Sequence, residues 1–254
     1  MSTVILGILV VSLAVLIAVA GLFLVRRLTS LNLREEHNAV AGFIYSGLAV
    51  AYAVVLGFVL ITVWGRYEAA SEKVDQEGAA LAAIYWTVDP LPDSDRRQVR
   101  QLARSYAQVV IDEEWPMMQD GKSSPYAWAL MDQLRQSMQH FEPSTPAEQV
   151  LYDHGLARVH ELSDARRLRL FEANTHIPTI LWVILVSGGV IMVGFPYLFG
   201  LKNTWVHTVM VVLLTVIVAS ILFAIYTLEH RFSADTQLTP EALELDLQQF
   251  EESP

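Results

Sequence analysis

The sequence contains no cysteine, which excludes disulfide bonds, cysteine-ligated zinc and thiol chemistry. Charge is scarce as well: only 17% of the 254 residues are charged, and 27 Asp and Glu outnumber 17 Lys and Arg. The resulting net charge of −10 argues against a nucleic-acid partner. The sequence also lacks a phosphate-binding glycine loop, a nucleophile elbow and a zinc motif, so nothing in it predicts an enzyme or a cofactor.

Hydrophobic residues are abundant instead and make up 53% of the chain, more than a soluble domain of this length normally contains. Four long runs hold no charged residue at all. As helices they are each roughly 33 Å long or more, which is enough to cross a hydrocarbon core of about 30 Å. We therefore expect a multi-pass protein of the cell membrane, in contact with the lipid bilayer, whose spans lie in residues 4–25, 39–64, 177–199 and 204–228.

The polar segments between these runs predict how the chain is divided. Residues 1–64 hold the first two spans, residues 65–176 form an extramembrane domain, residues 177–228 hold the last two spans, and residues 229–254 form an acidic tail. Helical spacing and proline positions predict helices throughout the extramembrane domain. The expected fold is all-α: a four-span transmembrane subunit with long helices extending into a helical domain. An even number of crossings places both termini and this domain on one side of the membrane.

Two helices are predicted to connect the spans to the extramembrane domain. Residues 66–86 contain no proline and can continue the second span as one helix. Thr145-Pro146-Ala147-Glu148 has the pattern of a capping box with proline at the first helical position, and it predicts the start of another helix. Because no further proline occurs before Pro178, that helix is expected to lead directly into the third span.

The second span carries two neighbouring stripes of residues at helical spacing. The first stripe is aromatic and polar at its start and aliphatic at its end, and beyond the membrane it reaches Glu77. The second stripe consists of small residues, which let helix backbones approach closely and so favour association in lipid. The first stripe contains Tyr45, Ala49, Tyr52, Leu56, Val59 and Val63, and the second contains Gly42, Ser46, Ala53 and Gly57.

Two interpretations of these stripes are open. In the first, the small stripe packs against a neighbouring helix and the other stripe lines the central axis of a homo-oligomer, because four spans of one chain enclose a water path poorly. Leu56, Val59 and Val63 then form an apolar constriction that gates by dewetting, and Glu77 on the vestibule wall favours cations. In the second, both stripes are packing surfaces within one four-helix unit.

Other candidate sites are weaker. His160 and Asp164 lie one helical turn apart and could share a metal ion, but this pairing is common on solvated helices. Asp112-Glu113-Glu114 could bind a cation, although a solvated helix end explains it more simply. His207 could line a pathway or occupy an interfacial position. Ser187-Gly188-Gly189 indicates close helix packing. We therefore predict no metal site.

The order of these elements resembles the bestrophin-like membrane proteins of bacteria and plastids over nearly the whole chain. The resemblance rests on the tyrosine-bearing second span that leads into WGRYEAASEKVDQEGAAL, on DEEWPMM at residues 112–118, and on LEHRFSADTQLTPEAL after the last span. In this last segment Arg231 and Ala234 stand where the family has a proline and a glycine.

Bestrophins are homopentameric ion channels with four spans per subunit, a pore lined by the second span, a neck of three bulky apolar residues, and cytoplasmic termini. The resemblance therefore implies a pentameric channel for inorganic ions with a cytoplasmic helical domain, and its neck is assigned to Leu56, Val59 and Val63. No acidic cluster matches the family's calcium site. The alternative function is a non-conducting membrane scaffold or regulator that binds partners through the helical domain and the acidic tail. A transporter is less well supported, because the spans lack buried charges and paired broken helices.

Overall fold

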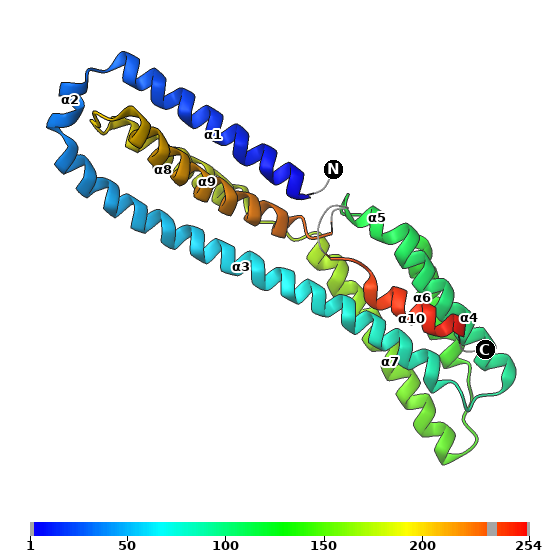
Figure 1. The fold of residues 1–254 in the computed structure, drawn as a ribbon. Coiled ribbons are helices and arrows are strands. Elements are labelled where there is room, and N and C mark those ends of the chain that lie inside the picture. Colours follow the sequence, from blue (N-terminus) through cyan, green and yellow to red (C-terminus); the bar gives the residue numbers. More distant parts are fainter. Residues whose placement is uncertain (1–2, 233–237, 253–254) are drawn as a thin grey trace. The chain divides into compact units, whose positions relative to one another are not determined.

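The structure is a computed structural model that describes residues 3–232 and 238–252, and all regular elements in these ranges are helices (Figure 1). The all-α fold predicted from the sequence is confirmed. The chain divides into two compact units. The first, which we call the membrane unit, comprises Met1–Gly65 and His176–Glu229. The second, the helical unit, comprises Arg66–Thr175 and His230–Pro254. Helix α3 contributes residues to both.

Four helices in the described part of the chain are long and apolar enough to cross a membrane, as predicted. In the most apolar stretch of each, no more than 22% of the residues are buried, so most apolar side chains face outward. Such a surface requires lipid or other protein around it. The helices of the membrane unit are α1 (Thr3–Leu28), α2 (Leu31–Glu36), α3 (Asn38–Thr87, up to Gly65), α8 (Thr179–Gly194), the 3₁₀-helix η2 (Phe195–Leu198) and α9 (Thr204–Glu229).

Helix α1 packs along α9, and small residues allow the two backbones to approach closely. A Cβ atom at Gly7 of α1 would lie 2.7 Å from the ring of Phe223, so a side chain there would require this ring to move. Further along the pair, Ala18, Leu22 and Val211 form a small buried cluster. This cluster and the contacts of α8 with α9 hold the membrane unit together.

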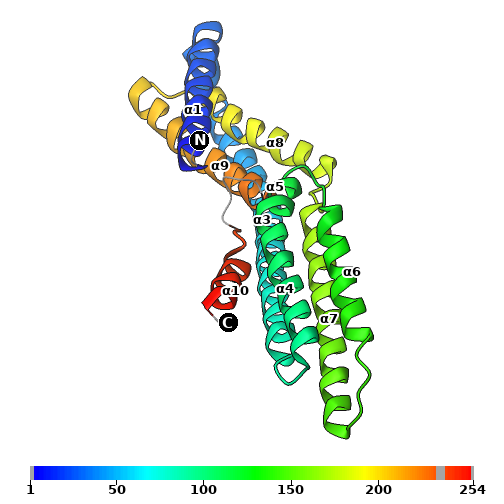
Figure 2. The ribbon, with the colours of Figure 1, turned by 90° about the vertical axis from the view of Figure 1, so that its right-hand side faces the viewer.

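The helical unit surrounds one hydrophobic core, to which all its long helices contribute. Figure 2 shows α4, α6 and α7 running side by side, and α10 lies against α4. The helices are α3 from Arg66 onward, α4 (Asp93–Val109), the π-helix η1 (Val110–Glu114), α5 (Trp115–Met118), α6 (Pro125–Gln139), α7 (Pro146–Ala173) and α10 (Glu241–Glu252).

The predicted capping box at the start of α7 is present. The Thr145 hydroxyl accepts a hydrogen bond from the backbone N–H of Glu148 at 3.2 Å, and the Glu148 carboxylate accepts one from the backbone N–H of Thr145 at 3.2 Å. Hydrogen bonds from the backbone and side chain of Ser144 and from the Thr145 backbone lower the pKa of Glu148. The box therefore fixes where α7 begins.

The predicted continuation of this helix into the third span is wrong. Helix α7 ends at Ala173 and α8 begins at Thr179. Asn174 and Thr175 donate side-chain hydrogen bonds to carbonyls of the last turn at 2.9 and 2.8 Å, which satisfies groups that a longer helix would use itself. Pro178 lacks an N–H and disfavours helical backbone in the residue before it. In contrast, α3 runs from Asn38 to Thr87, as the absence of proline predicted.

The acidic tail contributes a packed helix, α10, to the helical unit. The ring of Phe250 stacks on that of Tyr85 with 3.9 Å between centroids, and Leu243 is fully buried. The side chain of Asp246 lies against Gly78 of α3, where a Cβ would be 3.0 Å from Oδ2. That oxygen is buried without a hydrogen-bond partner among the described residues. Burial raises the pKa of Asp246 to about 6.

The docking of α10 should therefore weaken as pH rises. Below pH 4 the Asp246 carboxyl is protonated whether α10 is docked or released. Between about pH 4 and pH 6 the released form ionises first, so docking loses stability across this window and stays weaker above it. Amide hydrogen exchange in α10, corrected for intrinsic rates, should show falling protection over this range. Asp246→Asn should remove the dependence, whereas Glu244→Gln, at an exposed position of the same helix, should retain it. An unchanged pH dependence in Asp246→Asn contradicts this account.

Candidate functional site

One face of α3 in the membrane unit is occupied by helix α8 of the same chain. The Tyr52 hydroxyl donates a hydrogen bond to the Leu185 carbonyl at 2.8 Å. The Tyr52 ring lies directly over Gly188, where a Cβ would be 2.5 Å from a ring carbon. About two turns away, the Tyr45 hydroxyl donates to the Met192 carbonyl at 3.4 Å. The two tyrosines therefore attach α3 to α8.

The aliphatic end of the same stripe is also buried within the subunit. Leu56 and Val63 are only 6% and 2% exposed, and together with Leu185 and Ile225 they form a small hydrophobic core. Val59 is partly buried and packs against this core. Ala49 lines a narrow groove between α3 and the α8 and α9 helices. The six residues predicted to line the pore thus lie on the face of α3 that packs within its own chain. For this stripe the contacts are those of the second interpretation, packing within one subunit, whereas the small-residue stripe is not covered in the single chain.

The opposite face of α3 is uncovered in the single chain. Its large apolar side chains recur at steps of three and four residues, so they form one continuous stripe along the helix. We call this stripe the outer face of α3. It contains Phe43, Val50, Val54, Phe58 and Ile61, which are 84%, 66%, 51%, 69% and 71% exposed.

Small and hydroxyl-bearing residues accompany this outer face. Among them are the four residues predicted to pack against another helix. Gly42 and Gly57 have no described atom within 4 Å of the position where a side chain would begin, and Ala53 and Ser46 are exposed. The Ser46 hydroxyl donates only to the carbonyl of Gly42 one turn earlier, at 2.8 Å. Close packing of a neighbouring helix on these residues stays a prediction.

The outer surface of α1 has a different composition. Its exposed side chains are almost all large and aliphatic, as lipid contact requires, whereas α3 mixes large residues with glycine, alanine and serine. The exposed large residues of α1 are Val4, Ile5, Ile8, Leu9, Val10, Leu13, Leu16, Ile17, Phe23, Leu24 and Leu28.

In the helical unit, two glutamates and two arginines form a fully buried ionic network. Arg169 lies at its centre: its guanidinium donates to Glu77 at 2.5 and 2.9 Å and to Glu114 at 2.7 Å. Arg166 forms a second ion pair with Glu114, and the Tyr106 hydroxyl donates to Glu77 at 2.6 Å. All four charged side chains have no exposed surface, and their charges sum to zero.

The prediction that Glu77 faces ions on a vestibule wall is therefore wrong, because its carboxylate is enclosed by Arg169 and Tyr106. The same network accounts for the acidic run at Asp112-Glu113-Glu114. The run lies in the π-helix η1, whose wider turn allows two consecutive carboxylates to reach Ser124. The Ser124 N–H donates to Glu114 at 2.9 Å and its hydroxyl donates to Glu113 at 2.9 Å.

The charges within this network set the ionisation of its members. Burial alone would raise the pKa of Glu114, but hydrogen bonds from Arg166 and the charges of Arg169 and Arg166 outweigh burial, so the pKa is lowered. Burial raises the pKa of Tyr106 well above its usual value, and the negative charge of Glu77 adds to the effect. Glu114 is therefore an ionised acceptor at neutral pH, and Tyr106 is a neutral hydrogen-bond donor.

The remaining predicted positions do not form a catalytic or metal site. His160 and Asp164 are exposed, and Asp164 pairs with Arg167 at 3.0 Å. Within the part of the chain that the structure describes, no three histidine or acidic side chains converge on a point that could hold a metal. His207 is 1% exposed and hydrogen-bonds the Pro196 carbonyl at 2.9 Å, so it is buried within the membrane unit.

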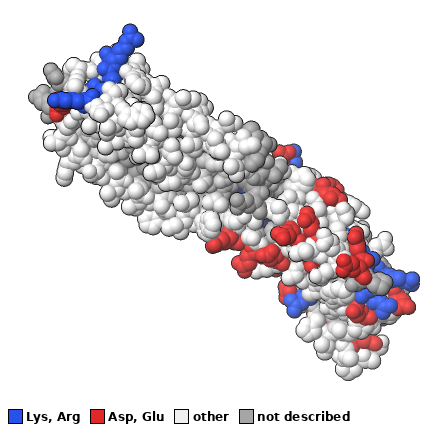
Figure 3. Space-filling model, in the orientation of Figure 1, with Lys and Arg blue, Asp and Glu red and all other residues white. Residues whose placement is uncertain are grey.

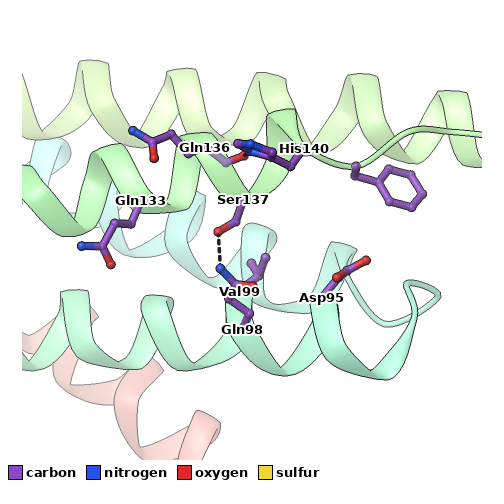
Figure 4. Close-up of a pocket in the computed structure, with 8 residues that line it drawn as sticks. Asp95, Gln98, Val99, Gln133, Gln136, Ser137 and His140 are labelled. Atoms are coloured by element: carbon purple, nitrogen blue, oxygen red, sulfur yellow. Dashed lines mark hydrogen bonds between the residues drawn. The ribbon is translucent and has the colours of Figure 1, made fainter.

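A polar groove of about 400 Å³ lies between α4 and α6 (Figure 4). The Gln98 amide donates to the Ser137 hydroxyl at 3.2 Å across it. Asp95 and His140 lie toward one end and do not point at one another. Half of the lining residues are exposed, and the lining offers amide and hydroxyl groups without a convergent charge. This groove does not suggest a reaction.

A family model described as the bestrophin-like domain matches residues 12–243. The chain belongs to the bestrophin-like family. Its fold is that of a bacterial bestrophin homolog from Klebsiella pneumoniae. Crystal structures of two single-residue variants of that homolog give TM-scores of 0.72 and 0.71, at 12% and 14% identity, covering 95% of this chain and 99% and 98% of theirs. A third, phased on zinc, gives 0.67 at 16% identity, covering 98% and 97%. The comparison with curated proteins finds no match.

Two family segments noted in the sequence have structural roles in the helical unit of this bestrophin-like chain. DEEWPMM supplies the π-helix and the Glu114 anchor. In the segment after the last span, Arg231 stands where the resemblance led us to expect a proline. Its side chain is 2% exposed and donates to the Glu172 carbonyl at 2.6 Å, at the end of α7. Ala234, the other departure, lies outside the described residues.

Replacing Arg169 by alanine should lower the stability of the helical unit by about 3–5 kcal/mol, because two buried carboxylates would each lose a partner. Arg167→Ala is a matched control: its side chain is 70% exposed, and the change should cost within about 0.5 kcal/mol. Chemical denaturation of the detergent-solubilised protein can compare the two. Equal loss of stability in both variants contradicts a central role for the network.

Proposed function

We propose that this protein is a homopentameric ion channel of the cell membrane, and that the outer face of α3 lines its pore. The observation that carries the proposal is the division of α3 into two faces. Tyr52, Leu56 and Val63 pack against other helices of the same chain. A pore lined by α3 must therefore be lined by the opposite face of this helix. That face is apolar, continuous and uncovered in the single chain.

The neck is best assigned to Val50, Val54 and Phe58. These residues follow one another at intervals of four, and each is more than half exposed. Five copies around an axis form three stacked apolar rings, which can close a narrow water path by dewetting. This assignment replaces Leu56, Val59 and Val63, whose side chains point into their own subunit.

Contact with lipid explains the composition of the outer face of α3 less well than contact between subunits does. If α3 faced lipid as α1 does, its exposed surface should be uniformly large and aliphatic. Instead Ser46, Gly47, Ala51 and Ala53 are exposed between the large residues, and such residues favour contact between helices. Ala53 and Gly57 also border the apolar groove of about 270 Å³ that Ala49 lines between α3 and the α8 and α9 helices, and this groove can receive side chains of a neighbouring subunit.

The pentamer, the cytoplasmic position of the helical unit and ion conduction are supported by family membership. The absence of charged side chains from the neck determines the ion selectivity that we expect. The α3 segment that crosses the membrane has no charged residue, and Glu77 is enclosed. We therefore expect a neck that discriminates weakly between cations and anions, rather than the cation preference expected from Glu77.

Val54→Ala and Phe58→Ala should each widen the neck and raise the current through planar bilayers containing the purified protein. Leu56→Ala and Val63→Ala are the matched controls, since they truncate buried side chains of the opposite face. They should lower stability by about 2–4 kcal/mol without raising current. In addition, Val54→Glu should shift selectivity toward cations.

Two results would contradict this proposal. If Leu56→Ala raises current and Val54→Ala does not, the pore lies on the face originally predicted. If an assembled wild-type protein and all variants fail to conduct at any voltage, the scaffold function is favoured, in which the helical unit and the tail bind partners.

A further inference from the structure

The end of the membrane unit that carries α2 holds two arginines whose recorded partners are all neutral. Arg26 donates to the Thr204 hydroxyl at 2.8 Å and to the Leu201 carbonyl at 3.3 Å. Arg34 donates to the Tyr197 carbonyl at 3.4 Å. Carbonyl and hydroxyl oxygens satisfy hydrogen bonds but do not cancel a positive charge.

His207 lies beside Arg26 and does not supply the missing negative charge. Its Nε2 faces the Pro196 carbonyl at 2.9 Å, so this nitrogen carries the proton. Its Nδ1 lies 3.2 Å from Nη1 of Arg26 and accepts from it. The imidazole is thus neutral, and the cluster of Arg26, Arg34 and His207 has a net charge of two positive units.

Arg34 is the more enclosed of the two arginines of this cluster. Only 7% of the residue is exposed, and its Nε is buried with no hydrogen-bond partner among the described residues. A buried charge is costly unless it is paired. An anion at this cluster would supply both the counter-charge and an acceptor for the unused donor.

An apolar groove of about 420 Å³ shares Tyr197 with this cluster. The Tyr197 ring lines the groove and lies 3.0 Å from where a Cβ of Gly21 would be, while its carbonyl accepts from Arg34. Arg26 follows Gly21 by five residues, about 7.5 Å further along α1. The groove is formed by α1, α8 and α9, and its lining includes Ala14, Ala18, Gly21, Gly189, Val193 and Ala219.

The charge at this end is opposite in sign to that of the whole chain. Residues 26–37 and 200–203 carry four basic side chains and two acidic ones, whereas the chain as a whole carries −10. Figure 3 shows Lys and Arg side chains at the end of the membrane unit where α2 lies, and others among the acidic side chains of the helical unit. This charge favours an anionic ligand, and the adjoining groove favours one with an apolar chain.

We propose that the arginine cluster and the groove together bind one anionic phospholipid. Its phosphate contacts Arg26 and Arg34, and one acyl chain occupies the groove as far as Tyr197. The site does not depend on ion conduction, since all of its residues belong to α1, α2, α8, η2 and α9 and none lies on α3.

The test titrates the full-length protein in detergent with phosphatidylglycerol and counts bound lipid by native mass spectrometry. Phosphatidylcholine and inorganic phosphate serve as separate arms. Phosphatidylglycerol should bind more tightly than phosphatidylcholine, and Arg26→Gln and Arg34→Gln should each weaken it about fivefold. Arg27→Gln is the matched control, because it removes the same charge from an exposed neighbour, and it should leave binding unchanged.

The groove is tested separately, in case loss of Arg34 disturbs folding. Ala14→Leu adds bulk to the groove lining and should weaken phosphatidylglycerol binding, whereas Ala20→Leu, at an exposed position outside it, should not. The proposal is overturned if the two lipids bind alike, if Arg27→Gln weakens binding as much as Arg26→Gln, or if inorganic phosphate binds equally and Ala14→Leu has no effect. It is also overturned if Ala14→Leu breaks the oligomer, since the groove then holds a neighbouring helix.

Discussion

The contact of Tyr52 with Gly188 determines which way α3 faces. A tyrosine ring fits over α8 only because two consecutive glycines leave its backbone bare, and the hydroxyl then reaches the Leu185 carbonyl. Inside a membrane a buried hydroxyl needs an acceptor, so the hydrogen bond to Leu185 fixes the orientation of the Tyr52 side chain. Leu56 and Val63 follow Tyr52 onto the same face, which leaves Val50, Val54 and Phe58 pointing away from the subunit.

In the helical unit, the buried ionic network holds the helices together. Its buried arginines connect helices far apart in sequence: Arg169 of α7 reaches Glu77 of α3 and Glu114 of the π-helix. Removing one partner is costly because the remaining charges stay buried. The conformation of α3 beyond the membrane is therefore coupled to that of α7. Helix α10 packs through the stacking of Phe250 on Tyr85 and places the Asp246 carboxyl, whose pKa burial raises to about 6, against Gly78 of α3.

Much of the fold could be predicted from local patterns. Uncharged runs gave the four spans, and Thr145-Pro146-Ala147-Glu148 gave the start of α7. The facing of α3 could not be predicted, because both of its faces are apolar and helical spacing alone does not say which one meets a partner. The sequence feature that bears on this orientation lies in α8, where Gly188-Gly189 predicted a close helix contact. The structure shows that the residue in contact with these glycines is Tyr52. Likewise, Glu77 looked available because its partner Arg169 lies 92 residues away.

The orientation of α3 can be tested directly, since the chain has no native cysteine to interfere. Val54→Cys in the assembled protein, treated with a short bifunctional maleimide, should give a ladder of cross-linked subunits. Leu13→Cys, exposed on α1, and Val63→Cys, buried on the inner face of α3, should stay monomeric on denaturing gels. Cross-linking through residue 63 but not residue 54, or no cross-linking at residue 54 in an intact oligomer, would contradict the outer face of α3 as the surface where subunits meet.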